Sequence, residues 1–286
     1  MDTGRREFLA TLAVGVVGAR VTGTEAQSTN QPNSGEASEF LTSLGEAYRP
    51  KLPPVRVRKV KTTTLFKAPE RSPNAVVATS EGFWIADQRS NNAHLVDANG
   101  KLLKSVKTES HNASGMAVGG GYIWMAANAK PYGIYQTDMN SKTVSRRQIP
   151  LGMVADGGGC HGAAYVDGKL WIASLRLHGI LRVDVQTWQP EFLISYAMPR
   201  AHGVAFDKTT NSIWMVMQNE QGTGLIKYDA QTGNTLEIAQ FGPADADPHG
   251  LTMQDDVLYS CDAGVHPGWP DEKSPTHGYI FRIDLS

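Results

Sequence analysis

An aromatic residue inside a short apolar run recurs five times along the chain, and successive aromatics lie 40 to 47 residues apart. No other feature restricts the fold as strongly, because a repeat of this period with several short strands and Gly/Asp turns is typical of the blades of a β-propeller. Solenoid repeats also recur but favour shorter periods. The five aromatics are Trp84, Trp124, Trp171, Trp214 and Tyr259.

Each repeat contains further strand signals around its aromatic. A short apolar strand precedes the aromatic run, and in the first four repeats an aspartate at the end of another strand follows 13 to 15 residues later. The strands are apolar almost throughout, as expected when neighbouring blades cover both faces. We therefore predict an all-β propeller with five blades. A sixth would have to lie before residue 55, where no strands are evident.

The ends of the repeat region indicate how the ring closes. The last repeat stops after its third strand, at Ser286, whereas residues 55–66 form a strand-like segment that belongs to no repeat. An N-terminal strand in the C-terminal blade would complete that blade and remove an open sheet edge. The predicted propeller domain is residues 55–286.

The N-terminal residues carry a different pattern. Arg5-Arg6 before Phe8-Leu9, a short apolar stretch and a small-residue exit resemble a twin-arginine export signal, with cleavage near Ala26. The alternative is an ordinary charged N-terminus. Residues 1–26 are thus predicted to be a signal peptide, and residues 27–54 an extension that is partly disordered with one short helix. This predicts a periplasmic or secreted protein.

Composition excludes several classes of protein. The 27 basic and 28 acidic residues nearly balance, so no nucleic-acid-binding surface is expected. No apolar run reaches the length of a membrane span. Two cysteines cannot make a disulfide framework or a four-thiolate zinc site. A small-molecule substrate is the partner that remains.

The strand before each aromatic run begins with a polar residue at the same phase, about ten residues before the aromatic. Innermost propeller strands surround the axis, so these positions should form a ring, and glycine after histidine lets the backbone approach the axis closely. Imidazoles from separate blades can bind a divalent metal ion. The alternative is that they fill the tunnel and bond through water. The phase contains Asn74, Ser114, His161, His202 and His249, and the predicted metal ligands are His161, His202, His249 and His111, the last compensating for Ser114.

Antiparallel strand order places other polar residues on the same rim as the histidines. Arg176 and Arg200 are candidates to fix a carboxylate or another oxyanion. Proline-rich residues 263–276 form the largest insertion and could cover a ligand. The predicted catalytic residues are His178, His277, Arg176 and Asp262. The predicted substrate-binding residues are Asn74, Asp87, Asn128, Tyr132, Gln218, His266 and Trp269.

The His-Gly dipeptides at 161, 202 and 249, each followed by an aromatic run, resemble those of the streptogramin (virginiamycin B) lyase propellers and the wider group that includes gluconolactonase-like hydrolases. The resemblance implies Mg²⁺-assisted elimination, with His249 or His202 as a rim histidine. The lyases usually have seven blades, and their catalytic glutamates have no clear match here.

These observations predict an exported metal-dependent lyase that acts on a small carbonyl- or ester-containing substrate at the propeller axis. The divalent ion would polarise the carbonyl, and His178 or His277 would remove the adjacent proton. Two alternatives stay open. One is a metal-dependent hydrolase of lactones or esters, and the other is a propeller that binds a ligand or partner without catalysis.

Overall fold

Twenty β-strands make up the described part of the chain, which a computed structural model covers at residues 55–151, 159–196, 200–219, 222–264 and 274–286. These residues belong to one compact unit, Leu52–Ser286. The predicted export signal and extension lie outside the described residues. Within the described ranges, no helix is long and apolar enough to cross a membrane.

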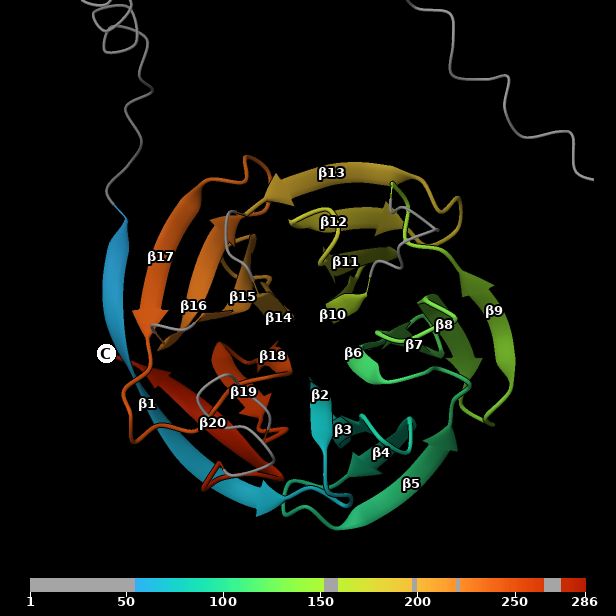
Figure 1. Cartoon of the computed structure of the whole chain (residues 1–286), viewed down its shortest axis with the longest axis horizontal. Helices are drawn as coiled ribbons and strands as arrows, with labels where there is room; N and C mark the ends of the chain where they lie inside the picture. Colours follow the sequence, from blue (N-terminus) through green and yellow to red (C-terminus); the bar gives the residue numbers. More distant parts are fainter. Residues whose placement is uncertain (1–54, 152–158, 197–199, 220–221, 265–273) are drawn as a thin grey trace, which may run out of the picture. The chain divides into compact units, whose positions relative to one another are not determined.

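The strands form five blades of four, and each blade runs antiparallel from an innermost strand to an outer one. Figure 1 shows the innermost strands β2, β6, β10, β14 and β18 around a common centre. The predicted all-β propeller is confirmed, with five blades. Blade 1 contains β2 (Pro73–Thr79), β3 (Gly82–Asp87), β4 (Asn92–Val96) and β5 (Leu102–Lys107). Blade 2 contains β6 (Ala113–Gly119), β7 (Tyr122–Ala127), β8 (Gly133–Asp138) and β9 (Thr143–Arg147). Blade 3 contains β10 (Cys160–Val166), β11 (Lys169–Ser174), β12 (Gly179–Asp184) and β13 (Pro190–Ser195). Blade 4 contains β14 (Arg200–Asp207), β15 (Ser212–Asn219), β16 (Gly222–Asp229) and β17 (Thr235–Gln240). Blade 5 contains β18 (Leu251–Gln254), β19 (Val257–Cys261), β20 (Tyr279–Leu285) and β1 (Arg56–Lys67).

The ring closes through its N-terminal strand, as predicted. Strand β1 pairs antiparallel with β20 from Val60↔Leu285 to Lys67↔Tyr279, so it is the outer strand of blade 5. Its first residues, from Arg56 to Lys59, pair in parallel with β17 of blade 4. One strand therefore ties the first described residues to the last two blades.

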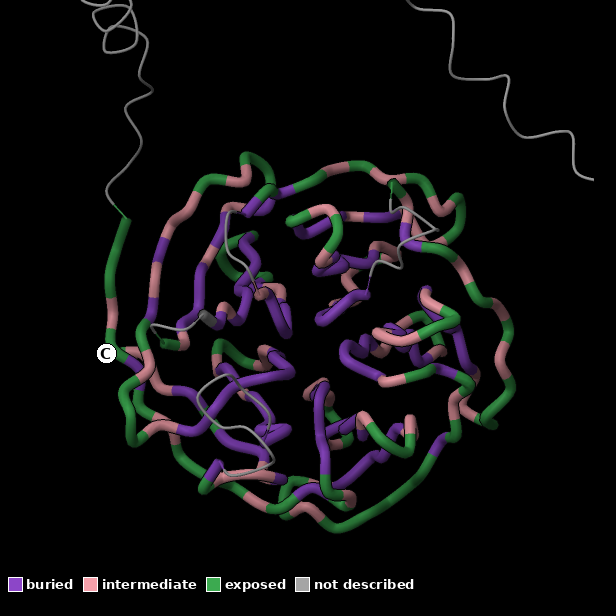
Figure 2. Tube along the Cα trace, viewed as in Figure 1, coloured by how far each residue is buried: buried purple, intermediate pink, exposed green. Residues whose placement is uncertain are grey.

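The recurring tryptophans lie on the second strand of their blades, and Trp84, Trp124, Trp171 and Trp214 are all buried. Figure 2 shows that the inner strands are mostly buried, whereas the outer strands carry most of the exposed residues. This burial on both faces accounts for the nearly continuous apolar runs in the sequence.

The recurring aspartates close turns. Oδ1 of Asp97 accepts hydrogen bonds from the backbone N–H groups of Asn99 and Lys101, and Asp138 makes the same two bonds in blade 2. Such bonds are the usual reason for aspartate in a tight turn. The aspartate repeat is therefore structural.

Glycines at the centre of the ring block the axis. We call Gly115, Gly162, Gly203 and Gly250, one from each of blades 2 to 5, the glycine collar. An added Cβ would lie 2.2 Å from the backbone nitrogen of Leu251 at Gly203, and 2.9 Å from Cα of Gly162 at Gly115. The space that the collar encloses has no room for a water molecule. A cavity of about 490 Å³ lies beyond it along the same inner strands.

Gly203→Ala should therefore be among the most damaging single-methyl changes in the protein. The new methyl would overlap backbone atoms that cannot move independently of blade 5, so we expect a loss of about 3 kcal/mol in the free energy of unfolding. Urea unfolding followed by circular dichroism measures this loss of stability. Gly242→Ala is the matched control, because there the closest atom is 3.3 Å away on the Asp245 side chain. Equal losses in the two variants would contradict a tight collar.

Candidate functional site

The inner strands bring the five residues of the predicted phase to one level of the axis. All five are buried, with exposed fractions of 2 to 8%. The ring centres of His161 and His202 lie 4.6 Å apart, and those of His202 and His249 lie 4.8 Å apart. The three imidazoles thus form a continuous arc across blades 3, 4 and 5.

The arc borders a small polar cavity of about 60 Å³, which we call the axial cavity. The glycine collar closes it toward the opposite end of the axis, because each collar glycine directly follows a ring position. The residues that line the axial cavity are Asn74, Gln88, Ser114, Asn128, His161, Arg200, His202 and His249.

The protonation state of His161 is set by its surroundings. Its Nδ1 lies 3.1 Å from the carbonyl oxygen of Ala201. A carbonyl only accepts, so Nδ1 carries the proton and Nε2 keeps a free lone pair. Burial, reinforced by the charge of Arg200, lowers the pKa of His161 to about 4. The ring is therefore neutral at physiological pH, as a metal ligand must be.

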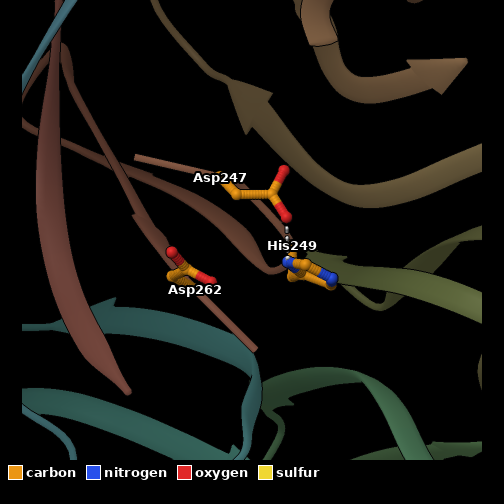
Figure 3. A group of neighbouring side chains, drawn as sticks. All are labelled: Asp247, His249 and Asp262. Carbon is orange, nitrogen blue, oxygen red and sulfur yellow. Dashed lines mark ion pairs between the residues drawn. The ribbon is translucent and has the colours of Figure 1, made fainter. Parts of the chain in front are cut away.

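His249 has a carboxylate beside it. Its Nδ1 lies 3.7 Å from Oδ2 of Asp247 (Figure 3) and accepts a hydrogen bond from the backbone N–H of Ala263 at 3.4 Å. Oδ1 of Asp247 accepts a hydrogen bond from Gln218, whereas Oδ2 accepts none from the described residues. Burial, with the nearby charge of Asp262, raises the pKa of Asp247 to about 8. Asp247 therefore lies beside His249 with one carboxyl oxygen hydrogen-bonded and the other without a partner among the described residues.

Asp262, which was predicted to be catalytic, is held by its own loop. It is fully buried, and it accepts hydrogen bonds from Gly264 N at 2.7 Å, Ser274 Oγ at 2.5 Å and Thr276 Oγ1 at 2.6 Å. Asp87, predicted to bind substrate, accepts from the backbone nitrogens of Ser72, Arg89 and Ser90. Both carboxylates fix the loops at the ends of their strands, and we leave them out of the proposed reaction.

The spacing of the three imidazole rings is near that of imidazoles bound to one metal ion. Imidazoles bound to one tetrahedral ion through nitrogens at about 2.0 Å have ring centres about 5 Å apart, close to the spacing found. Among the described residues, the group whose ligand atoms all lie within 4.8 Å of one another is Asp247, His249 and Asp262, whereas the three arc histidines do not form such a group. Within this group Asp262 accepts three hydrogen bonds, whereas Oδ2 of Asp247 accepts none from the described residues.

Several predicted residues lie away from the axial cavity. His111 is exposed and precedes strand β6, and Ser114 occupies the ring position of blade 2 instead. Arg176 and His178 are exposed, and His277 packs against Gly264. Tyr132 does not line the cavity, and Gln218 lies behind Asp247 and Pro248. His266 and Trp269 lie outside the described residues.

Besides Gln88, which lines the axial cavity and was not singled out from the sequence, two residues of this region were not among the predicted site residues by role. Arg200 lines the axial cavity, although the sequence offered it only as one of two arginines able to fix an oxyanion. Asp247 was missed altogether. Each stands two residues before a ring histidine, so the alternation of side chains along a strand could have indicated both.

The buried acid gives a test of stability against pH. In the unfolded chain Asp247 ionises near 3.8, but in the folded protein near 8, so the folded state holds the extra proton between these values. The free energy of unfolding should fall as pH rises through this window. Asp247→Asn removes this loss. We therefore expect the free energy of unfolding of the variant, relative to that of the natural protein, to increase by about 3 kcal/mol between pH 5 and pH 8.

Urea unfolding of chelator-treated protein at several pH values measures that difference, since bound metal would add its own pH dependence. Asp284→Asn is the control, because the Asp284 side chain is 45% exposed and its ion-pair partner among the described residues is the neighbouring Arg282. The low pKa of His161 contributes a loss of stability as pH falls from 6.5 toward 4, and it is common to both proteins. A constant difference across pH would contradict the buried carboxyl group.

Comparisons with known proteins establish the fold. No family model matches the chain, and no curated protein matches it either. Its structure is similar to that of glutaminyl cyclase from Myxococcus xanthus, with a TM-score of 0.59 and 9% identity over 82% of this chain and 99% of that one. Virginiamycin B lyase from Staphylococcus aureus (14% identity, 77% and 69% coverage) and a streptogramin B lyase (16% identity, 77% and 67% coverage) both have a TM-score of 0.46. The likeness to the first of these shows a shared propeller fold and no more.

Proposed function

We propose that the protein is an exported metal-dependent lyase that acts on a small carbonyl- or ester-containing substrate at the propeller axis. The observation that carries this proposal is the arc of three buried imidazoles on the axial cavity, with Nε2 of His161 left free by the bond to Ala201. Export rests on the twin-arginine sequence alone.

His161, His202 and His249 would hold the divalent ion, and a bound ion would polarise a substrate carbonyl. Residues of the protein itself would orient the substrate and exclude water. The side chains of Asn74, Ser114 and Asn128 lie on the cavity wall and would orient the carbonyl group. The glycine collar keeps water from entering along the axis.

None of His178, His277 and Asp247 lines the axial cavity, so the proposal does not assign proton removal to one of them. Elimination requires a base that takes the proton from the carbon next to the carbonyl. The electron pair of that C–H bond becomes the new C=C bond, and the ester oxygen leaves with the electrons of its own bond to carbon. Proton and charge then balance without any further reactant.

Hydrolysis of a lactone or ester is the second candidate. A cavity of about 60 Å³ has room for roughly four water molecules, since each needs about 10–15 Å³ of such space. A water molecule beside the bound carbonyl could attack it, whereas elimination needs none. The size of the cavity therefore keeps this reaction open.

Product analysis separates the two reactions. A panel of small esters and lactones is incubated with the protein in ¹⁸O-enriched water. Elimination yields a new C=C bond that absorbs in the ultraviolet, whereas hydrolysis places ¹⁸O in the acid product. A glutaminyl peptide belongs in the panel because of the name of the Myxococcus protein, and cyclisation would release ammonia. Turnover of none of these compounds by metal-loaded protein would favour a propeller that only binds.

A further inference from the structure

We propose that the axial cavity is a carboxylate-binding site in which Arg200 holds the anion, so that the substrate is a small carboxylic acid of two or three carbons. This inference names the substrate class of the proposed enzyme, but the binding itself does not depend on the reaction. It rests on Arg200, on the absence of acids from the cavity wall and on the size of the cavity.

The guanidinium of Arg200 is placed for a ligand. Arg200 begins strand β14 and lies at the cavity wall, half-buried. Among the residues that the structure describes, its guanidinium has no hydrogen-bond or ion-pair partner. Arginine presents five N–H donors in a fixed fork that matches a carboxylate. No nitrogen of Arg200 is both buried and without a partner, so the donors of this half-buried fork stay accessible to a ligand.

The other groups of the cavity wall suit an anion as well. The eight lining residues contain amides, a hydroxyl, imidazoles and Arg200, but none of them is acidic. The nearest acid acting on Arg200 is Asp247, which attracts it through space while its Oδ1 is bonded to Gln218. The cavity therefore carries one fixed positive charge and many hydrogen-bond donors.

Charge balance strengthens the same conclusion for the metal-loaded protein. A divalent ion on the histidines would share the small cavity with the Arg200 cation, and two cations at this range repel strongly where water is scarce. A bound carboxylate would weaken that repulsion, because its negative charge can lie between the two cations. An uncharged ketone or ester would leave that repulsion in place.

Size limits the anion. The cavity of about 60 Å³ takes about as much as four waters, which is enough for a carboxylate with one or two attached carbons. Larger acids would have to extend out of the cavity away from the closed collar end. The probe is therefore acetate, with chloride and sulfate as the competing anions.

The test measures anion binding to full-length, untagged protein. Saturable thermal stabilisation by acetate at constant ionic strength gives the dissociation constant, because a ligand of the folded state raises the unfolding temperature. We expect acetate to bind to the natural protein and chloride to have no saturable effect. Arg200→Gln should weaken acetate binding about 10- to 100-fold, the effect of losing one or two charge-assisted hydrogen bonds.

Two further variants keep the result interpretable. Arg200→Lys retains the charge without the fork and should weaken binding about tenfold, which separates fork geometry from charge alone. Arg146→Gln removes an exposed arginine from outer strand β9 and should leave acetate binding unchanged. Circular dichroism confirms that each variant is folded before binding is measured.

Three results would overturn the inference: equal acetate affinity in Arg200→Gln and the natural protein, a chloride effect as large as that of acetate, or tighter binding of sulfate than of acetate. Metal content is measured on the same samples. Arg200-dependent acetate binding by protein that takes up no metal would sustain this inference and defeat the proposed function. Metal uptake without acetate binding would do the reverse.

Discussion

Protein in which His161 and His249 are both replaced by alanine is expected to hold less than about a tenth of an ion per chain, where the natural protein holds about one. The double variant leaves a single imidazole, His202, in the arc. One neutral nitrogen in a cavity that also contains the Arg200 cation cannot retain a divalent ion through dialysis. Elemental analysis of untagged protein by mass spectrometry measures the content directly.

A matched pair of histidines controls for the loss of imidazole as such. His111 and His178 are both exposed and do not line the axial cavity. Their double replacement by alanine should leave the metal content unchanged, and it also tests the sequence-based assignment of His111 as a ligand. Equal metal content in the axial double variant and the natural protein would remove the proposed centre.

The fold was predictable because its determinants repeat. Trp124 and Trp171 mark the same strand of successive blades, and the period between them measures one blade. The closure of the ring was predictable because the last repeat has three strands and one strand-like segment near the N-terminus belongs to no repeat. The segment expected at residues 55–66 is strand β1, which spans Arg56–Lys67 and pairs with β20.

The ring was predictable for the same reason, but its exceptions were not. Alignment on the aromatics placed all five ring positions correctly at the axis. His111 was added to compensate for Ser114, yet β6 begins only at Ala113, so His111 precedes the strand and is exposed. Histidine is not required at every position, because Asn74 donates a hydrogen bond to Ser114 across the first two blades.

The rim residues show what composition alone cannot resolve. Asp262 and Asp87 were expected to act on a substrate, but both are occupied by hydrogen bonds from nearby loops. A sequence reveals that an acid ends a strand, whereas its bonds depend on how the next loop folds back. The places of Arg200 and Asp247 could have been predicted. Each lies two residues before a ring histidine, His202 or His249, and residues two apart on a strand share a face.

Val60→Asp is expected to cost about 4 kcal/mol or more of the free energy of unfolding, because it opens the ring where its two ends meet. Val60 is 8% exposed and packs in the core of blades 4 and 5 with Phe281 and Leu225. A charged group there has no partner and pays the full cost of burial. Loss of β1 would also leave β20 as an open edge, so the variant should aggregate on heating.

Val57→Asp supplies the contrast on the same strand. Val57 is 65% exposed and pairs with Ile238 through the backbone only, so the new charge meets water and should change the free energy of unfolding by less than about 0.5 kcal/mol. Urea unfolding of the two variants measures the difference. A similar, small effect of both would mean that β1 contributes little to closure. The ring would then depend on contacts between blades alone, and the axial cavity would keep its shape without the N-terminal strand.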